Sequence, residues 1–380
     1  MKKTLLASAA IAGIVFASAP AQAQMELTIG GHSKNYIGYL DQDDRAGVET
    51  RNFDMQRETE LHFNGEATLD SGLTFGFQVE TEVDGGDDEN TIEESYVYMS
   101  GTWGRVNLGS EDGAAYLLQV AAPSADSNID GIRQYIQPVN YANLNAAFAG
   151  PDAIASAPFG TRGQVEGFDY DQDVTGSAEK ITYLSPNFNG FQAGVSYTPD
   201  VNDADQAALG NGNPVSNGFN SDDVAGSLGA AMEAAVRYEG VFNNVGFATG
   251  AGYTNIDREA GNLDDYDEWN VGLDLDVGAF GIGAVYKDTD TGAAANSDID
   301  TYVVGADYTT GPFKFGASYF DQDDQTVGAA ELETQRYTGG VIYTAGPGLT
   351  FRGSLSHIEH ERGAVDADAT SLMGGVQINF

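Results

Sequence analysis

Clusters of acidic side chains are the most prominent groups in this sequence that could do chemistry. They stand at residues 39–44 (YLDQDD), 319–324 (YFDQDD) and 170–173 (YDQD). Grouped carboxylates suit Ca²⁺ or Mg²⁺, which take oxygen ligands, and such an ion could bridge loops or lipid phosphates. The two longer clusters are not EF-hands, because Ala46 and Thr326 stand where that motif requires glycine. A Ca²⁺ site at these acidic loops is one interpretation, and a solvated acidic surface is the second.

Catalytic chemistry has little support in the sequence. Cysteine is absent, which excludes disulfide scaffolds, thiolate metal sites and thiol nucleophiles. His357 and His360 are three residues apart, and strand geometry sends such residues to opposite faces. The chain contains no GxSxG elbow, HExxH motif or Walker A loop. We therefore expect neither an enzyme nor a cofactor.

Charge and composition exclude two further classes of protein. The 380 residues include 57 acidic and 17 basic side chains, which gives a formal net charge of −40. Nucleic-acid binding is excluded, because affinity for phosphate backbones comes from Lys and Arg. A disordered acidic tail is also excluded, because such a tail would lack the 19 Phe, 19 Tyr and 2 Trp found here.

The first residues have the pattern of a secretory signal peptide. Lys2 and Lys3 form a positive start, an apolar stretch follows over residues 5–19, and residues 21–23 read AQA. The apolar stretch is too short to span a bilayer, and AQA fits a cleavage site. We predict that residues 1–23 are a cleaved signal peptide, which leaves 15 basic against 57 acidic residues and a charge of −42.

The rest of the chain alternates apolar and polar residues with a period of two. In residues 73–80 and 269–277 every second residue is apolar, which is the pattern of a strand with one apolar and one polar face. The same pattern occurs at residues 191–197, 232–238, 245–253, 313–319, 337–343, 349–355 and 372–380.

Two kinds of connection alternate between these strands. Short turns rich in Gly, Asn, Ser or Pro lie at residues 70–72, 101–104, 187–190, 243–244, 278–281, 310–312 and 345–348. Longer acidic loops lie at residues 41–50, 84–91, 113–178, 200–228, 257–266, 288–298, 321–333 and 359–368. Seven turns and eight loops make fifteen connections, which predicts sixteen strands.

An even-numbered array of this kind is typical of an outer-membrane barrel. Every backbone group in lipid must be paired, and only a closed sheet removes the edges. The predicted fold class is all-β: a transmembrane barrel of sixteen antiparallel strands, with short periplasmic turns and long extracellular loops, over the single domain 24–380. Such a barrel is too wide to fill with side chains and leaves an aqueous channel. Tyrosines near strand ends, including Tyr36, Tyr39, Tyr96 and Tyr98, are expected in an aromatic belt.

Three stretches carry a family resemblance. Residues 181–191 (ITYLSPNFNGF) resemble the hairpin of strands 6 and 7 in Gram-negative general porins. Residues 95–109 (SYVYMSGTWGRVNLG) are similar to the hairpin before the inserted loop of these porins. The ending 376–380 (VQINF) resembles the signal, with a terminal phenylalanine at Phe380, by which barrel-assembly machinery recognises its clients. With the signal peptide, the resemblance covers essentially the whole chain.

The resemblance implies a homotrimer in the outer membrane, surrounded by lipid and lipopolysaccharide. It also implies that the third long loop folds into each barrel and narrows it. Here that loop is residues 113–178, and a loop of this length without strands is uncommon unless it is functional or disordered. Within it we expect Asp126, Asp130 and Arg133 at the constriction.

The wall facing that loop departs from the family pattern. Many general porins carry Arg at lumen positions on strands 2 and 4, where Glu60 and Glu93 stand in this sequence. On strand 4 the parity is ambiguous, because Tyr96 and Tyr98 share the parity of Glu94. Cations on the wall must then come from the remaining strands. Strand parity places the following residues on the polar, inward face: His32, Lys34, Glu58, Glu60, Arg105, Lys180 and Arg352.

The function implied is passive diffusion of small hydrophilic solutes and ions through a water-filled pore. Rings of Asp and Glu favour cations, so we expect a cation-preferring channel. The negative charge could instead decorate the outer loops for solubility, which leaves the ion preference open. The sequence is also compatible with a substrate-selective channel, which would show saturable block, and with a plugged adhesin or structural barrel, which would show no conductance.

Overall fold

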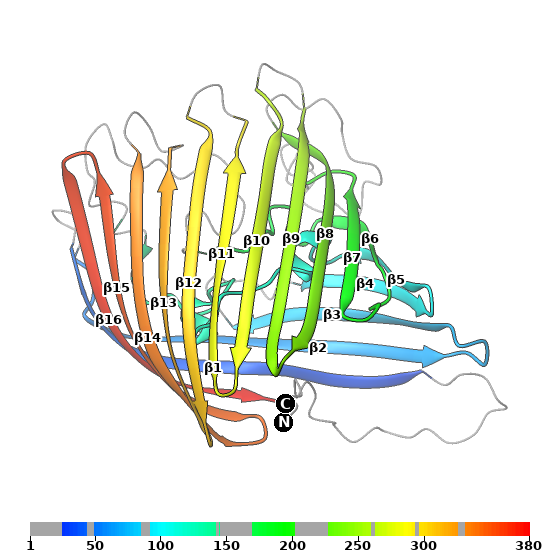
Figure 1. The fold of residues 1–380 in the computed structure, drawn as a ribbon, viewed down its shortest axis with the longest axis horizontal. Helices are drawn as coiled ribbons and strands as arrows, with labels where there is room; N and C mark the ends of the chain where they lie inside the picture. The colour runs from blue at the N-terminus through cyan, green and yellow to red at the C-terminus, as the bar shows by residue number, and fades with distance from the viewer. Residues whose placement is uncertain are drawn as a thin grey trace.

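A closed antiparallel barrel of sixteen strands is the architecture of the chain (Figure 1). The computed structural model describes residues 25–43, 49–84, 92–141, 144, 169–201, 227–259, 263–292, 296–325 and 331–380. Each strand pairs with its sequence neighbours, and β1 pairs with β16 to close the ring. The predicted fold class and strand number are therefore confirmed. The predicted signal peptide, residues 1–23, lies outside the described residues and stays a prediction.

The strands follow one another without a crossover. Their bounds are β1 Glu26–Gln42, β2 Phe53–Thr68, β3 Thr74–Asp84, β4 Ile92–Gly101, β5 Gly104–Ser110, β6 Glu179–Leu184, β7 Phe191–Thr198, β8 Leu228–Phe242, β9 Val245–Arg258, β10 Tyr266–Val277, β11 Phe280–Asp290, β12 Asp298–Thr310, β13 Phe313–Asp324, β14 Leu332–Gly346, β15 Leu349–Arg362 and β16 Val365–Asn379. Two short helices, α1 Ala114–Leu117 and α2 Ser127–Asp130, follow β5. No helix among the described residues is long and apolar enough to cross a membrane.

All seven predicted short turns join the expected strand pairs, and the turns after β8, β10, β12 and β14 lie together at the lower end in Figure 1. The turn between β8 and β9 has Asn243 and Asn244 at φ 49° and 65°, a conformation that asparagine tolerates. One connection differs from the prediction. The long loop expected at 359–368 is a two-residue turn, Gly363 and Ala364, between β15 and β16. The charged residues before this turn suggested a loop, but they alternate between the two faces of β15.

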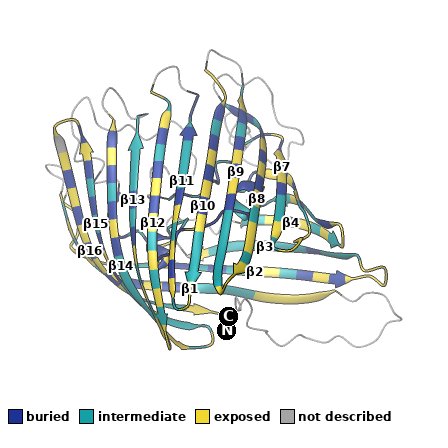
Figure 2. Ribbon diagram, viewed as in Figure 1, coloured by how far each residue is buried: buried dark blue, intermediate teal, exposed yellow. Residues whose placement is uncertain are grey.

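Burial alternates along the strands as the predicted parity requires (Figure 2). On β10, Trp269, Val271 and Leu273 are exposed on the outer face, while Glu268 and Asn270 are buried on the inner face. The barrel is therefore apolar outside and mainly polar inside, as lipid on one side and water on the other demand. Val303, Phe320 and Ile358 of the inner face form an apolar cluster with Val139 and Tyr141 of the segment after β5.

Three tyrosines assigned to the aromatic belt lie on the inner face instead. Tyr36 and Tyr96 are buried, while Ile37 and Val97 are exposed on the outer face. Tyr98 shares the inward parity of Tyr96. The belt expectation was wrong for these three, because position near a strand end does not determine which face a side chain takes. Tyr39 is exposed on the outer face, at the outward parity of β1.

Candidate functional site

The inner wall of the barrel is in direct contact with the segment that follows β5, residues 111–141. A Cβ added at Gly272 on β10 would lie 2.5 Å from the carbonyl oxygen of Val120, and one at Gly305 on β12 would lie 2.9 Å from the carbonyl carbon of Pro123. Real Cβ atoms do not come so close, so only glycine allows this approach. Glycines on neighbouring strands lie against the same segment in the same way. We call this row of residues the glycine track; it consists of Gly194, Gly250, Gly252, Gly272, Gly283, Gly305, Gly316 and Gly340.

The glycine track was not predicted from the sequence, although a signal existed. Glycine inside a strand weakens it and often marks the close approach of another backbone. These glycines occur at the polar parity of successive strands β7 and β9–β14, which is a pattern that alternation alone does not require. Alternation assigns apolar and polar side chains to faces, and glycine has no side chain to assign.

Asp126 ties this segment to the wall. Its carboxylate accepts a hydrogen bond from Arg352 Nη1 at 2.7 Å and from the Tyr36 hydroxyl at 2.9 Å. The residue is fully buried, and it also caps α2 by accepting from the Asn128 backbone N–H at 3.3 Å. Removing one member of such a buried pair leaves an uncompensated charge and costs about 3–5 kcal/mol. The pair therefore fixes α2 against β1 and β15.

Asp130 contacts the wall at β13, two strands from β15 in the barrel. The Ser318 hydroxyl of β13 donates to its carboxylate at 2.7 Å. Burial raises the pKa of Asp130 to about 6, against the opposing effect of the Ser318 hydrogen bond. One carboxylate oxygen, Oδ1, is buried with no hydrogen-bond partner among the described residues, which is consistent with a carboxyl group that protonates readily.

Arg133 joins two parts of the same loop. Its guanidinium lies 3.2 Å from Asp171 and 3.5 Å from Asp112, and it also contacts Asp173. Arg133 therefore offsets part of the charge of the acidic repeat at 170–173. Asp126 and Asp130 are bound to the wall, and Arg133 is bound to acidic residues of its own loop. Their expected position at the constriction, and its effect on conduction, stay predictions.

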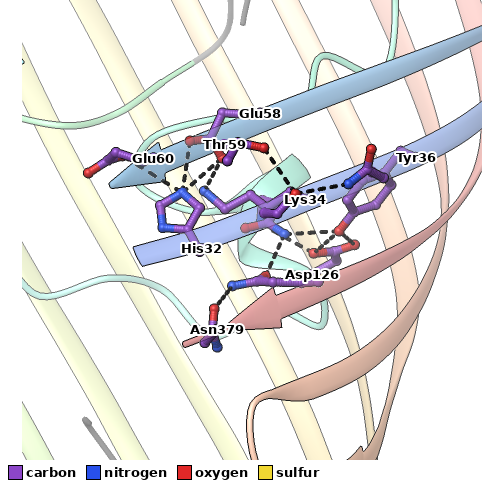
Figure 3. Close-up of polar contacts among 12 residues, drawn as sticks. His32, Lys34, Tyr36, Glu58, Thr59, Glu60, Asp126 and Asn379 are labelled. Atoms are coloured by element: carbon purple, nitrogen blue, oxygen red, sulfur yellow. Dashed lines mark hydrogen bonds and ion pairs between the residues drawn. The ribbon is translucent and has the colours of Figure 1, made fainter. Parts of the chain in front are cut away.

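A second cluster lies on β1 and β2 (Figure 3). His32 Nε2 lies 2.8 Å from Glu58 Oε1, and Lys34 Nζ lies 2.7 Å from Glu58 Oε2. Lys34 also sits over the ring of Tyr135, 3.1 Å from its centroid. Glu60 is in contact at 2.6 Å with His62, a residue that was not among the predicted wall residues. Cross-strand pairing of Lys34 with Glu58, and of His32 with Glu60, brings these groups together.

The remaining wall residues lie on the inward parity at separate places. Arg105 donates to Asn107 at 2.6 Å and lies 4.0 Å from the ring centroid of Tyr98. Lys180 is buried and donates to the carbonyl oxygens of Glu111 and Gly176. Arg352 forms an ion pair with Asp126. The predicted wall cations therefore lie on β1, β5, β6 and β15, and each has partners of its own.

Glu93 is not in the position expected for it. The register of β3 and β4 shifts there, because Glu94 pairs with Glu80 and Ile92 pairs with Thr81, so Glu93 is the extra residue of a bulge. Glu94 has the inward parity of the buried Tyr96, and it occupies the place on the wall that was expected for Glu93. The family alignment selected Glu93, whereas alternation on this strand already favoured Glu94 through its shared parity with Tyr96 and Tyr98.

Further charged residues of the inner face were not predicted, and Arg336 and Glu80 are two examples. Arg336 on β14 is fully buried and stands over the ring of Phe320, 4.9 Å from its centroid. Glu80 on β3 pairs across the sheet with His62 and lies 3.6 Å from its Nδ1 atom. Strand parity places both residues on the inner face. The family resemblance, however, concerned wall positions on strands 2 and 4.

Comparison with known proteins identifies a match over nearly the whole chain. The family model of Gram-negative porins matches residues 7–363. Among solved structures, the anion-selective porin from Comamonas acidovorans has a TM-score of 0.64 at 19% identity, covering 94% of this chain and 100% of that chain. A mutant of Rh. blastica porin has a TM-score of 0.57 at 18% identity, covering 93% and 100%. At these identities the likeness shows the fold alone.

Curated relatives match over shorter stretches. Outer membrane porin protein 32 of Delftia acidovorans is 29% identical over 208 residues, which are 53% of this chain and 50% of that protein. A monosaccharide porin of Halomonas sp is 26% identical over 227 residues, 56% of this chain and 54% of that protein. An uncharacterized protein of Rickettsia felis is 31% identical over 111 residues, 28% and 24%. The chain thus spans from 24% to 54% of the length of these three relatives.

An engineered disulfide can test whether residues 114–125 lie against the inner wall. The chain has no cysteine of its own, so no other thiol interferes. A Cβ at Gly252 would lie 3.4 Å from Ala115 Cβ, close to the separation of about 3.5–4.5 Å in disulfides. We expect the double variant Ala115→Cys with Gly252→Cys to lose both free thiols on mild oxidation, measured by mass spectrometry of thiol-labelled folded protein.

The matched control is Ala115→Cys with Gly339→Cys, since Gly339 has the outward parity of β14. This control should keep both thiols free. Free thiols in the first variant, in protein that is folded, would contradict the seat on the glycine track.

Proposed function

The chain belongs to the Gram-negative porin family, and on that premise we propose that it forms a water-filled channel in the outer membrane for passive diffusion of small hydrophilic solutes and ions. The observation that carries the proposal is the closed sixteen-stranded barrel with polar side chains inside and apolar side chains outside. Porins are channel proteins, so membership of this family also favours a channel over an enzyme. The proposal includes export through the cleaved signal peptide at residues 1–23.

We propose that residues 113–178 narrow this channel. Support comes from the contacts of Val120, Pro123 and Asp126 with six strands of the inner wall, β1, β9, β10, β11, β12 and β15. An extended segment held this way lies inside the ring of strands, where it reduces the open cross-section. A plugged barrel would conduct no ions, so conductance distinguishes the two proposals.

We further propose a preference for cations, from the charge of the wall formed by β1–β4. These four strands contain two Lys or Arg residues, Lys34 and Arg57, and Arg57 has the outward parity. Facing inward on the same strands are Glu58, Glu60, Glu80 and Glu94. Lys34 is paired with Glu58, so this part of the wall keeps net negative charge in a low-dielectric surrounding.

The solved porin from Comamonas acidovorans is named as anion-selective. At 19% identity its wall residues are not those of this chain, so its name does not fix the ion preference here. The monosaccharide porin of Halomonas raises the alternative of a sugar-selective channel. Saturable block of the ion current by a monosaccharide would support that alternative, and a simple pore shows no such block.

The ion preference is tested by the zero-current potential of the purified protein in a planar bilayer across a KCl gradient. We expect stepwise conductance and a potential of the sign that K⁺ preference produces. The double variant Glu60→Gln with Glu80→Gln should reduce the K⁺ to Cl⁻ permeability ratio by about twofold or more, because it removes charge from the pore wall.

The control is Glu333→Gln, since Glu333 has the outward parity of β14 and is exposed. It should leave the ratio unchanged. An anion-selective potential in the wild type would contradict the proposed cation preference, and absence of any conductance by folded protein would contradict the channel itself.

We propose that the protein is a homotrimer with β1 and β2 in the interface. Near the middle of these strands the outer face is polar, with Ser33 donating to or accepting from Thr59 at 2.9 Å, and with Asn35 opposite Arg57. Asn35 and Arg57 are both exposed. An arginine facing lipid at the bilayer midplane costs about 2–4 kcal/mol, so another protein surface is the better neighbour.

The oligomer is tested by native mass spectrometry of the folded protein in detergent. We expect the mass of three chains, and we expect Arg57→Asp to lower the temperature at which trimers dissociate, because it replaces a long cationic side chain of the proposed interface with a short anionic one. The matched control, Asn255→Asp, adds a charge to the outer face of β9, away from β1 and β2 in the strand order. A monomeric wild-type protein would contradict the proposal.

Further partners are proposed on narrower grounds. The backbone of Phe380 closes the ring, since its N–H donates to Gly31 O at 3.1 Å and its carbonyl accepts from the Gly31 N–H at 3.0 Å. We propose that barrel-assembly machinery binds this terminal strand, and that outer-membrane lipid and lipopolysaccharide surround the barrel. Ca²⁺ at the acidic loops stays a proposal, since parts of those loops lie outside the described residues.

A further inference from the structure

Two imidazoles and one carboxylate converge on the inner wall between β1 and β2. His62 Nε2 lies 2.6 Å from Glu60 Oε1, and His32 Nε2 lies 3.7 Å from Glu60 Oε2. The donor atoms that these three residues offer all lie within 4.8 Å of one another. Ligand atoms around a tetrahedral zinc ion are roughly 3.3 Å apart, so small side-chain rotations would bring all three to one ion.

The sheet register holds these donors on one face. His32 and Glu60 are directly opposite each other on β1 and β2, and His62 follows Glu60 by two residues on the same face. The rings of His32 and His62 are perpendicular, with centroids 6.1 Å apart. Because the backbone of two paired strands fixes the three positions, binding would require rotation of side chains alone.

Neighbouring groups complete the surroundings that metal-binding histidines need. Glu80 lies 3.6 Å from His62 Nδ1, and a small rotation would bring it to hydrogen-bond distance, where it would accept the second ring proton and orient the imidazole. Glu58 lies 2.8 Å from His32 Nε2 and is available as a fourth ligand. Lys34 neutralises Glu58, which leaves Glu60 and Glu80 to balance the two charges of a divalent ion.

The side chains are also accessible from the interior of the barrel. The side chains of His32 and His62 keep 15% and 29% of their exposure, and that of Glu60 keeps 9%. Figure 3 shows the His32 ring between Glu58 and Glu60, next to Lys34. An ion dissolved in the channel could reach the cluster without a change in the strands.

We propose that His32, Glu60 and His62 form a binding site for a first-row divalent metal ion of the zinc type on the inner wall of the barrel. Imidazole nitrogens select Zn²⁺, Ni²⁺ or Cu²⁺, whereas Ca²⁺ and Mg²⁺ prefer sites built from oxygen alone. Three protein ligands leave a position for water or for Glu58, as in zinc sites with two histidines and one glutamate. This site is separate from the acidic loop clusters, and it does not depend on the ion preference proposed above.

The test is isothermal titration of the folded protein in detergent with ZnCl₂, and with CaCl₂ for comparison. We expect one Zn²⁺ per chain and no comparable heat with Ca²⁺. His32→Gln and His62→Gln should each weaken Zn²⁺ binding by about tenfold or more, because each removes a ligand while keeping a side chain of similar size. His357→Gln, on the outer face of β15, should bind as the wild type does.

Folding of each variant is checked by its heat-dependent migration on gels, and a second readout reports the ligands directly. Co²⁺ bound in place of Zn²⁺ should give visible absorption bands of a four- or five-coordinate site in the wild type, and these bands should be absent from the double variant His32→Gln with His62→Gln. Zn²⁺ binding of equal affinity in the wild type and this folded double variant would overturn the proposal. Absence of stoichiometric binding by the wild type would overturn it as well.

Discussion

A stretch of backbone, residues 118–126, approaches the inner wall so closely that a side chain on the wall would collide with it. The glycine track makes this approach possible, and the contacts of α2 depend on it. Once the segment lies on the track, Asp126 reaches Arg352 and Tyr36, and Asp130 reaches Ser318. Side chains at several positions of the glycine track would displace the segment. The contacts of Asp126 and of Asp130 with the wall would then be lost. The glycines of the track therefore determine the arrangement of the barrel interior as much as its charged side chains do.

Charge inside the barrel is organised in pairs and small groups, not as two facing rings. Arg352 is paired with Asp126, Lys34 with Glu58, Lys287 with Glu268 and Lys314 with Asp307. Partly buried pairs of this kind neutralise cations that the sequence alone would assign to the pore. A permeating ion experiences the wall charge that these ion pairs do not compensate. On β1–β4 this uncompensated charge is negative. The net charge of the whole chain, −40, is a poorer guide because it includes the outer loops.

Much of the fold could be predicted from the sequence, and less of the site. Alternation and turn residues predicted the strand number, because lipid outside and water inside force a period of two. The family alignment failed at Glu93, where a bulge shifts the register, and the loop expected at 359–368 was wrong because charged residues there belong to β15. Contacts between distant parts of the chain could not be predicted, since no local pattern states that Gly305 meets Pro123 or that Tyr36 meets Asp126.

The central claim, that residues 114–130 are fixed to the inner wall, is tested most directly by hydrogen–deuterium exchange followed by mass spectrometry. In the folded wild-type protein we expect slow exchange at Leu117, Ile129 and Asp130, whose N–H groups donate to backbone carbonyls of the same segment. In Arg352→Gln, exchange should become faster over residues 124–130 while β9–β11 keep their protection, because the buried Asp126 loses its cation. Exchange of residues 114–130 at the rate of an unstructured chain in the wild type would contradict the claim.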